Sequence, residues 1–102
     1  MSYANTEIAV IQWGEARGIV QNSTAKAQAW KTVEEVNELL MAIEANDVAA
    51  MKDAYGDILV TLVMGCACAD LDLVECFKGA YNEIKHRKGY LDEDGVFVKE
   101  ST

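Results

Sequence analysis

The 102-residue sequence contains no proline, one histidine and three cysteines. Because proline interrupts helix interiors, its absence permits long continuous helices. The single histidine, His86, has no acid or nucleophile partner in the sequence, so we expect an exposed side chain. Cys66, Cys68 and Cys76 cannot all pair with one another, and we interpret them as small core-filling thiols of a cytosolic protein.

The sequence also lacks a long apolar run. Its most apolar stretch, residues 58–69, is too short to span a bilayer and has Asp57 and Asp70 at its ends. The first ten residues have neither the basic region nor the long apolar core of a signal peptide. We therefore expect one cytoplasmic domain over residues 1–102, with no membrane partner.

Basic residues are scarce, with nine Lys and Arg against seventeen Asp and Glu and a net charge of -8. Nucleic-acid backbones are bound mainly by clustered Lys and Arg, so this balance argues against a nucleic-acid partner. Four of the basic residues nevertheless lie close together: Lys78, Lys85, Arg87 and Lys88. This local cluster suits a small polyanion.

Apolar residues recur at three- and four-residue spacing and predict an all-α fold, a four-helix bundle. We expect helices from residue 5 or 6 to 18, from 25 to 45, from 48 to 69, and from 70 or 72 to 89. Residues 21–24 are expected to form a loop. The tail has an Asp94-Gly95 turn signal and then a short strand. The middle two helices carry more apolar residues than one small core can hide, which favours a homodimer or homotetramer.

Two acidic clusters at helical spacing are the most informative pattern. The first is Glu34, Glu35 and Glu38, and the second is Asp53 and Asp57. Residues three or four apart share a helix face, so packing the two helices would bring carboxylates together. Hard cations such as Mg²⁺ or Mn²⁺ select carboxylate oxygens. Exposed helix carboxylates are, by spacing alone, more often plain solvated surface.

The motif E-E-V-N-E in one predicted helix and D-A-Y-G-D-I-L in the next resemble the MazG-type all-α nucleoside triphosphate pyrophosphohydrolases. The similarity covers nearly the whole chain, and small bacterial and phage MazG-like proteins often have a comparable C-terminal segment. Four features occur in the same order: Gln28, the E-x-x-E of Glu35 and Glu38, the G-D of Gly56 and Asp57, and the basic segment of the last helix.

The resemblance implies Mg²⁺-dependent conversion of a nucleoside triphosphate to the monophosphate and pyrophosphate. It also implies a dimer that completes the active site, or a dimer of dimers. The chain departs from the family pattern at one position, because Ala54 stands where the second acidic motif usually has glutamate. Asp53, four residues before Asp57, is expected to substitute for it.

The expected roles follow from the charge of the substrate. Glu35, Glu38, Asp53 and Asp57 are the predicted metal ligands, and Glu34 or Asp53 would orient or deprotonate water. Lys31, one turn before Glu35, is expected to pair with that glutamate along the helix.

The predicted substrate-binding residues fall into two groups. Lys85, Arg87 and Lys88 would contact the phosphates, although a solvated basic helix end is the alternative. Asn82 suits a base edge or a water on the metal, and a surface asparagine fits equally well. Gln28, Trp13 and Trp30 are candidates for a nucleoside pocket, whereas core packing is the alternative for either tryptophan.

The sequence thus favours a nucleotide pyrophosphohydrolase that cleans the nucleotide pool. Phosphoribosyl-ATP pyrophosphohydrolase, with similar fold and chemistry, is the nearest alternative. A non-catalytic helical module that binds nucleotide or a protein partner is the alternative from another class, because Ala54 replaces a metal-binding glutamate.

Overall fold

The computed structural model describes residues 1–100, which form five helices and one β-hairpin. The helices are α1 (Tyr3–Ala16), α2 (Ile19–Asn22), α3 (Ala25–Glu44), α4 (Val48–Cys68) and α5 (Leu73–Ile84). Strands β1 (Gly89–Leu91) and β2 (Phe97–Lys99) pair antiparallel, with Tyr90 opposite Val98. The predicted all-α class is confirmed, with this small sheet added.

Side-chain caps fix where the long helices begin. Thr24 accepts from the Ala27 amide, Asp47 from the Ala50 amide and Asp72 from the Val74 amide. Helices α3 and α4 are each followed by a left-handed residue, Asn46 and Asp70 respectively. The bounds predicted for these two helices are confirmed to within one residue.

Three local predictions were wrong. Helix α1 begins earlier than expected, because Ser2 rather than Asn5 or Thr6 accepts the capping bond, from the Asn5 amide at 3.1 Å. The expected loop at 21–24 is partly helical, since Gly18 adopts a positive φ of 76° and starts the short helix α2. Helix α5 ends at Ile84 rather than at Gly89, which instead pairs with Lys99 in the hairpin.

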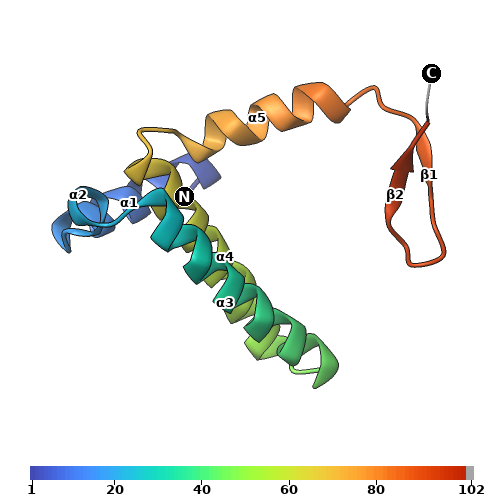
Figure 1. Ribbon diagram of the computed structural model, residues 1–102, viewed down its shortest axis with the longest axis horizontal. Helices are drawn as coiled ribbons and strands as arrows, with labels where there is room; N and C mark the ends of the chain where they lie inside the picture. Colours follow the sequence, from blue (N-terminus) through green and yellow to red (C-terminus); the bar gives the residue numbers. More distant parts are fainter. Residues whose placement is uncertain (101–102) are drawn as a thin grey trace.

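Helices α3 and α4 form a long antiparallel pair, and α1 crosses one end of it (Figure 1). The two central helices are joined by a hydrogen bond of 2.7 Å between the hydroxyls of Thr32 and Thr61. Gly14 of α1 lies so close to Met64 of α4 that an added Cβ would collide with the methionine sulfur. Helix α4 therefore packs against both α3 and α1.

The fourth long helix does not close a bundle within one chain. Helix α5 extends away from the α3–α4 pair and carries the hairpin at its far end (Figure 1). The radius of gyration is 16.0 Å, against about 13 Å for a compact chain of this length. Among the described residues, the buried apolar side chains are few: Ala42, Ala54, Val63 and Met64.

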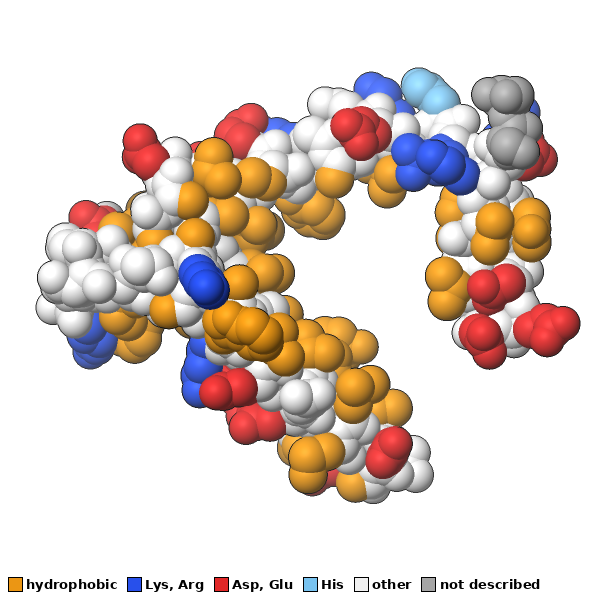
Figure 2. Space-filling model, viewed as in Figure 1, with side chains coloured by type: hydrophobic (Ala, Val, Ile, Leu, Met, Phe, Trp, Pro, Cys, Tyr) orange, Lys and Arg blue, Asp and Glu red, His pale blue; other side chains and the backbone are white. Residues whose placement is uncertain are grey.

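Large apolar side chains are exposed on α1, α3, α4 and α5. Figure 2 shows many of them on the faces that border the open angle between α5 and the α3–α4 pair. Examples are Leu40 (55% exposed) on α3, Tyr55 (57%) on α4 and Phe77 (65%) on α5. No helix in the described part of the chain is both long enough and apolar enough to cross a bilayer.

The cysteine prediction holds only in part. Cys66 and Cys68 are half-buried, whereas Cys76 is exposed on α5 and fills no core. The prediction failed there because α5 lies away from the core. His86 is exposed, as predicted.

Candidate functional site

Glu35 lies at the centre of the acidic region, on the middle of α3. It is 8% exposed, and its Oε2 atom is buried without a hydrogen-bond partner. Its Oε1 atom lies 3.7 Å from Lys31 Nζ, which confirms the predicted pairing along the helix. The lysine is shared, because Glu34 Oε2 lies closer, at 3.0 Å.

Three of the predicted carboxylates, those of Glu35, Glu38 and Asp57, lie near one another. Burial raises the pKa of Glu35, and the nearby carboxylates of Glu38 and Asp57 raise it further. The structure thus brings Asp57 of α4 to the two glutamates of α3. As these side chains stand, no set of three or more His, Cys, Asp or Glu within residues 1–100 converges as a metal-binding group. The arrangement concentrates negative charge that a cation would offset.

The remaining acidic candidates lie at the edge of this group. Glu34 is exposed and faces Lys31. Asp53 is exposed and lines the same cavity as Asp57, one helical turn away. Ala54 stands where the family pattern usually has a glutamate, and it is 4% exposed. A carboxylate is therefore missing from a buried position, while Asp53 offers one on an exposed face.

A cavity of about 610 Å³ lies between α1 and α4 and adjoins the acidic group through Asp57. Its walls include Val10, Val60 and Val63, together with the carboxylates of Glu7 and Asp53. Its size and largely apolar lining are those of a small-molecule site. Asp57 lines the cavity and also raises the pKa of Glu35, so the cavity and the acidic group share this residue.

The predicted nucleoside-pocket residues lie outside this cavity. Gln28 donates to Ser23 Oγ at 3.0 Å and packs beside Gly65, so it joins α3 to its preceding loop and to α4. Trp13 is 43% exposed, with the Arg17 guanidinium 5.0 Å from its ring centre. Trp30 is 63% exposed. Neither tryptophan packs in the core, and neither lines the cavity.

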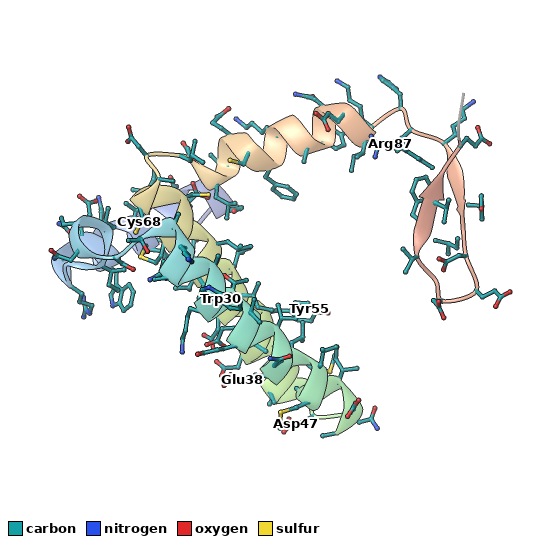
Figure 3. All side chains as sticks on the ribbon, viewed as in Figure 1. Trp30, Glu38, Asp47, Tyr55, Cys68 and Arg87 are labelled. Carbon is teal, nitrogen blue, oxygen red and sulfur yellow. The ribbon has the colours of Figure 1, made fainter. Side chains whose placement is uncertain are left out.

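The predicted phosphate-binding residues lie far from the carboxylates within one chain. Figure 3 places Arg87 beyond the end of α5 and Glu38 on the other arm of the molecule. Lys85 donates to Asn82 Oδ1 at 3.3 Å, and both are exposed, as are Arg87 and Lys88. The chain alone therefore does not bring the basic and acidic residues together.

Glu7 was missed by the sequence analysis. It is 4% exposed on α1, lines the cavity, and accepts from the Val74 amide through Oε2 at 3.3 Å. Its Oε1 atom is buried without a partner. A signal was available, because Glu7 is three, four and seven residues before Val10, Ile11 and Gly14, on the buried face of a helix.

The chain is similar in sequence to a phage protein. A protein of Haemophilus phage HP1 (strain HP1c1), described as "Uncharacterized 18.2 kDa protein in rep-hol intergenic region", is 38% identical over 53 residues. The match covers 52% of this chain but 32% of the phage protein, so the chain spans about a third of that relative. No solved structure matches the chain.

The family comparison is more extensive. Residues 23–91 match the family described as the MazG nucleotide pyrophosphohydrolase domain. The match includes the carboxylates of α3 and α4, the whole of α5 and the basic residues that follow it. The chain belongs to the MazG nucleotide pyrophosphohydrolase family.

Proposed function

We propose that the protein is a divalent-metal-dependent pyrophosphohydrolase that converts a nucleoside triphosphate to the monophosphate and pyrophosphate. The observation that carries this proposal is the buried, unpartnered Oε2 of Glu35 beside the carboxylates of Glu38 and Asp57. A buried carboxylate oxygen without a donor is costly, so a ligand that supplies positive charge fits this position.

The donor set suits Mg²⁺, with Mn²⁺ as a substitute, because all the candidate ligands are carboxylate oxygens. Glu35, Glu38 and Asp57 would hold the cation, and Asp53 would reach it from the cavity side. When bound, the metal would neutralise charge on the triphosphate and make water more acidic.

The chain's own residues supply orientation and proton transfer. Asp53 lines the cavity beside Asp57. This supports the proposal that its carboxylate, where it does not bind the cation directly, accepts the proton of the attacking water. Glu34 is the weaker candidate, because Lys31 already holds its carboxylate at 3.0 Å. Water attacks the α-phosphorus, the bond between that phosphorus and the bridging oxygen breaks, and pyrophosphate leaves.

We further propose that a second copy of the chain supplies the basic residues. Lys85 caps the C-terminal end of α5, which extends away from the α3–α4 pair, and Arg87 and Lys88 follow it in the chain (Figure 1). The exposed apolar faces of α3, α4 and α5 offer an interface for a homodimer. Phosphate charge would then be neutralised from both sides. A cytoplasmic role in removing unwanted nucleotides is consistent with this chemistry.

The experiment is product analysis with a panel of canonical and modified ribo- and deoxynucleoside triphosphates and phosphoribosyl-ATP. Each substrate is tested with Mg²⁺, with Mn²⁺ and with excess chelator. We expect equal amounts of monophosphate and pyrophosphate, and none with chelator. If only phosphoribosyl-ATP released pyrophosphate, that compound would be the substrate. If no compound did, the protein would be a non-catalytic binding module.

A further inference from the structure

Helix α5 contacts α1 at its first turn. The Val74 amide donates to Glu7 Oε2 of α1 at 3.3 Å, and the ring centre of Phe77 lies 6.3 Å from that of Tyr3, one turn before Glu7. Beyond this turn, α5 extends away from the other helices (Figure 1). The contacts of α1 with the first turn of α5 therefore help to set the direction of the whole helix.

Two carboxylates converge on the Val74 amide. Asp72 Oδ1 accepts from this amide at 3.2 Å as the cap of α5, and Glu7 Oε2 accepts from it at 3.3 Å. One N–H hydrogen is thus shared between two acidic side chains, and it satisfies only one oxygen of Glu7. The other oxygen, Oε1, is buried without a partner, in a residue that is 4% exposed.

No positive charge is paired with these two carboxylates. Within residues 1–100, no lysine, arginine or histidine forms an ion pair with Glu7 or Asp72. Besides Asp72, the titratable neighbours of Glu7 are Tyr3 of α1 and Cys66 of α4. The other charged side chains that line the same cavity are those of Lys52, Asp53 and Asp57.

A proton is the group that satisfies this arrangement. An ionised carboxylate only accepts hydrogen bonds, whereas a protonated carboxyl also donates one. Two carboxylates that share a buried site commonly keep one proton between them. Burial raises the pKa of Glu7 and the Asp72 carboxylate raises it further, whereas the Val74 amide and the Tyr3 hydroxyl oppose the shift. Protonation of Glu7 turns Oε1 from an unpaired acceptor into a donor.

We propose that Glu7 donates a shared proton from Oε1 to the Asp72 carboxylate, and that this proton fixes the first turn of α5 on α1. When the proton is lost, two negative charges repel each other at the Val74 amide, and the first turn of α5 loosens. Helix α5 is about 18 Å long, so a tilt at its start is amplified at Lys85, its last cap. Glu7 is thus a positioning residue for the basic end of α5, a role that rests on the proposed function.

Carboxyl ¹³C NMR of the metal-free full chain tests the shared proton. The Glu7 signal is assigned by its absence from Glu7→Gln. Over about pH 3 to 8, we expect Glu7 to keep its proton above the ordinary glutamate value of about 4.3. The Val74 amide should shift with the same midpoint. Ionisation of Glu7 at or below that value, or a Val74 amide that does not follow it, would overturn the inference.

Hydrogen exchange tests the effect on α5. The Cys76 amide, bonded to the Asp72 carbonyl at 3.1 Å, reports on the first turn. Corrected for intrinsic exchange, its protection should fall by about tenfold or more as Glu7 ionises, the range for a hydrogen bond to a charged group. In Glu7→Gln the side-chain amide donates to Asp72 at every pH, so protection should stay constant. Glu15→Gln, at an exposed glutamate of α1, is the matched control and should follow wild type. Parallel curves for wild type and Glu7→Gln would count against the proposal.

Asp72→Asn distinguishes the shared proton from a bond to the Tyr3 hydroxyl. Asparagine still caps α5, but it carries no negative charge to hold a proton on Glu7. Since Asp72 raises the Glu7 pKa, we expect Glu7 to ionise at lower pH in this variant. Unchanged ionisation of Glu7 would mean that Asp72 is not its partner, and the inference would fail.

Kinetics test the positioning role. The KM for a nucleoside triphosphate in wild type, relative to that in Glu7→Gln, should rise with pH as Glu7 ionises, with little change in kcat. If triphosphates are hydrolysed without this difference, Glu7 is not a positioning residue, although the proposed function stands. If no triphosphate is hydrolysed, the proposed function fails, and the NMR and exchange measurements still decide whether the proton fixes α5.

Discussion

Glu7 and Glu35 are both glutamates that the described chain buries while leaving one oxygen of each unpartnered. Glutamate is rarely buried unless its charge is paired. Burial is the first cause of the raised pKa at both side chains, and neighbouring acids add to it. Glu7 lies on α1 and lines the cavity, whereas Glu35 lies on α3. Burial of these two carboxylates costs stability in the ligand-free chain.

Loss of Glu38 should separate activity from folding. Glu38 is exposed, so Glu38→Gln removes a metal-binding charge at nearly constant volume with little effect on packing. We expect pyrophosphate release to fall by about 100-fold or more, with an unchanged Tm. Glu44→Gln, at an exposed glutamate of the same helix, is the control. Equal activity in the two variants would place the metal elsewhere.

The stability of the ligand-free protein should depend on the Glu7 carboxyl. Burial and then Asp72 raise the pKa of Glu7, whereas the Val74 amide opposes the shift. The folded chain therefore binds this proton more tightly than the unfolded chain. Its contribution to stability is complete below the ordinary glutamate value of about 4.3 and is lost as pH rises through the folded pKa.

Glu7→Gln should remove that dependence, because the amide stays neutral and can still accept from Val74. We expect its Tm to exceed that of wild type by about a few degrees at neutral pH, the two curves converging near pH 4. Thermal unfolding from pH 4 to 8 without nucleotide measures this difference. A constant offset across the range would show that Glu7 does not titrate differently on folding.

At the scale of single elements, α4 organises the molecule. Its Met64 is 2% exposed and meets Gly14 of α1, so one side chain holds the crossing of the two helices. Met64→Ala would leave a cavity at that crossing. We expect a loss of about 2 to 5 kcal/mol in the free energy of unfolding, measured in urea. Val48→Ala, at an exposed position of the same helix, should change it far less. A small effect at Met64 would mean that α1 docks by other contacts.

The bounds of α3 and α4 could be predicted from the sequence, because the residues that cap and end a helix act on neighbouring backbone groups. Thr24, Asp47 and Asn46 act on backbone groups within a few residues, so their positions mark the helix ends directly. The end of α5 was less predictable, since Gly89 reads as a helix stop but pairs in a hairpin with a strand ten residues later. Whether Gly89 ends a helix or pairs in a hairpin depends on contacts with residues that are distant in the sequence.

For the site, too, local spacing could be predicted from the sequence and long-range packing could not. Helical spacing indicated that packing the two helices would bring carboxylates together, and the family resemblance singled out Glu35, Glu38 and Asp57, which lie near one another. The cavity was not predictable in this way, as it arises where α1 crosses α4. Gln28 and Trp13 were assigned to a nucleoside pocket from residue type, and neither lines this cavity.

At the scale of the whole molecule, the open shape separates the two charged groups that the chemistry requires. Helix α5 carries its basic end away from the α3–α4 pair, and its apolar residues Phe77, Tyr81 and Ile84 are each more than half exposed. A second copy packed into the open angle would bury these faces. Whether basic and acidic residues act across that interface can be tested by mixing subunits.

Two variants, each expected to be inactive alone, provide this test. Glu38→Gln removes an acidic ligand, and Arg87→Ala removes a phosphate contact at the far end of the same chain. If sites form between subunits, a mixed dimer has one site built from the intact halves of both chains. After equal mixing and reassociation, about a quarter of the wild-type sites should be active. If each chain completed its own site, every site in the mixture would carry a defect and no activity would return.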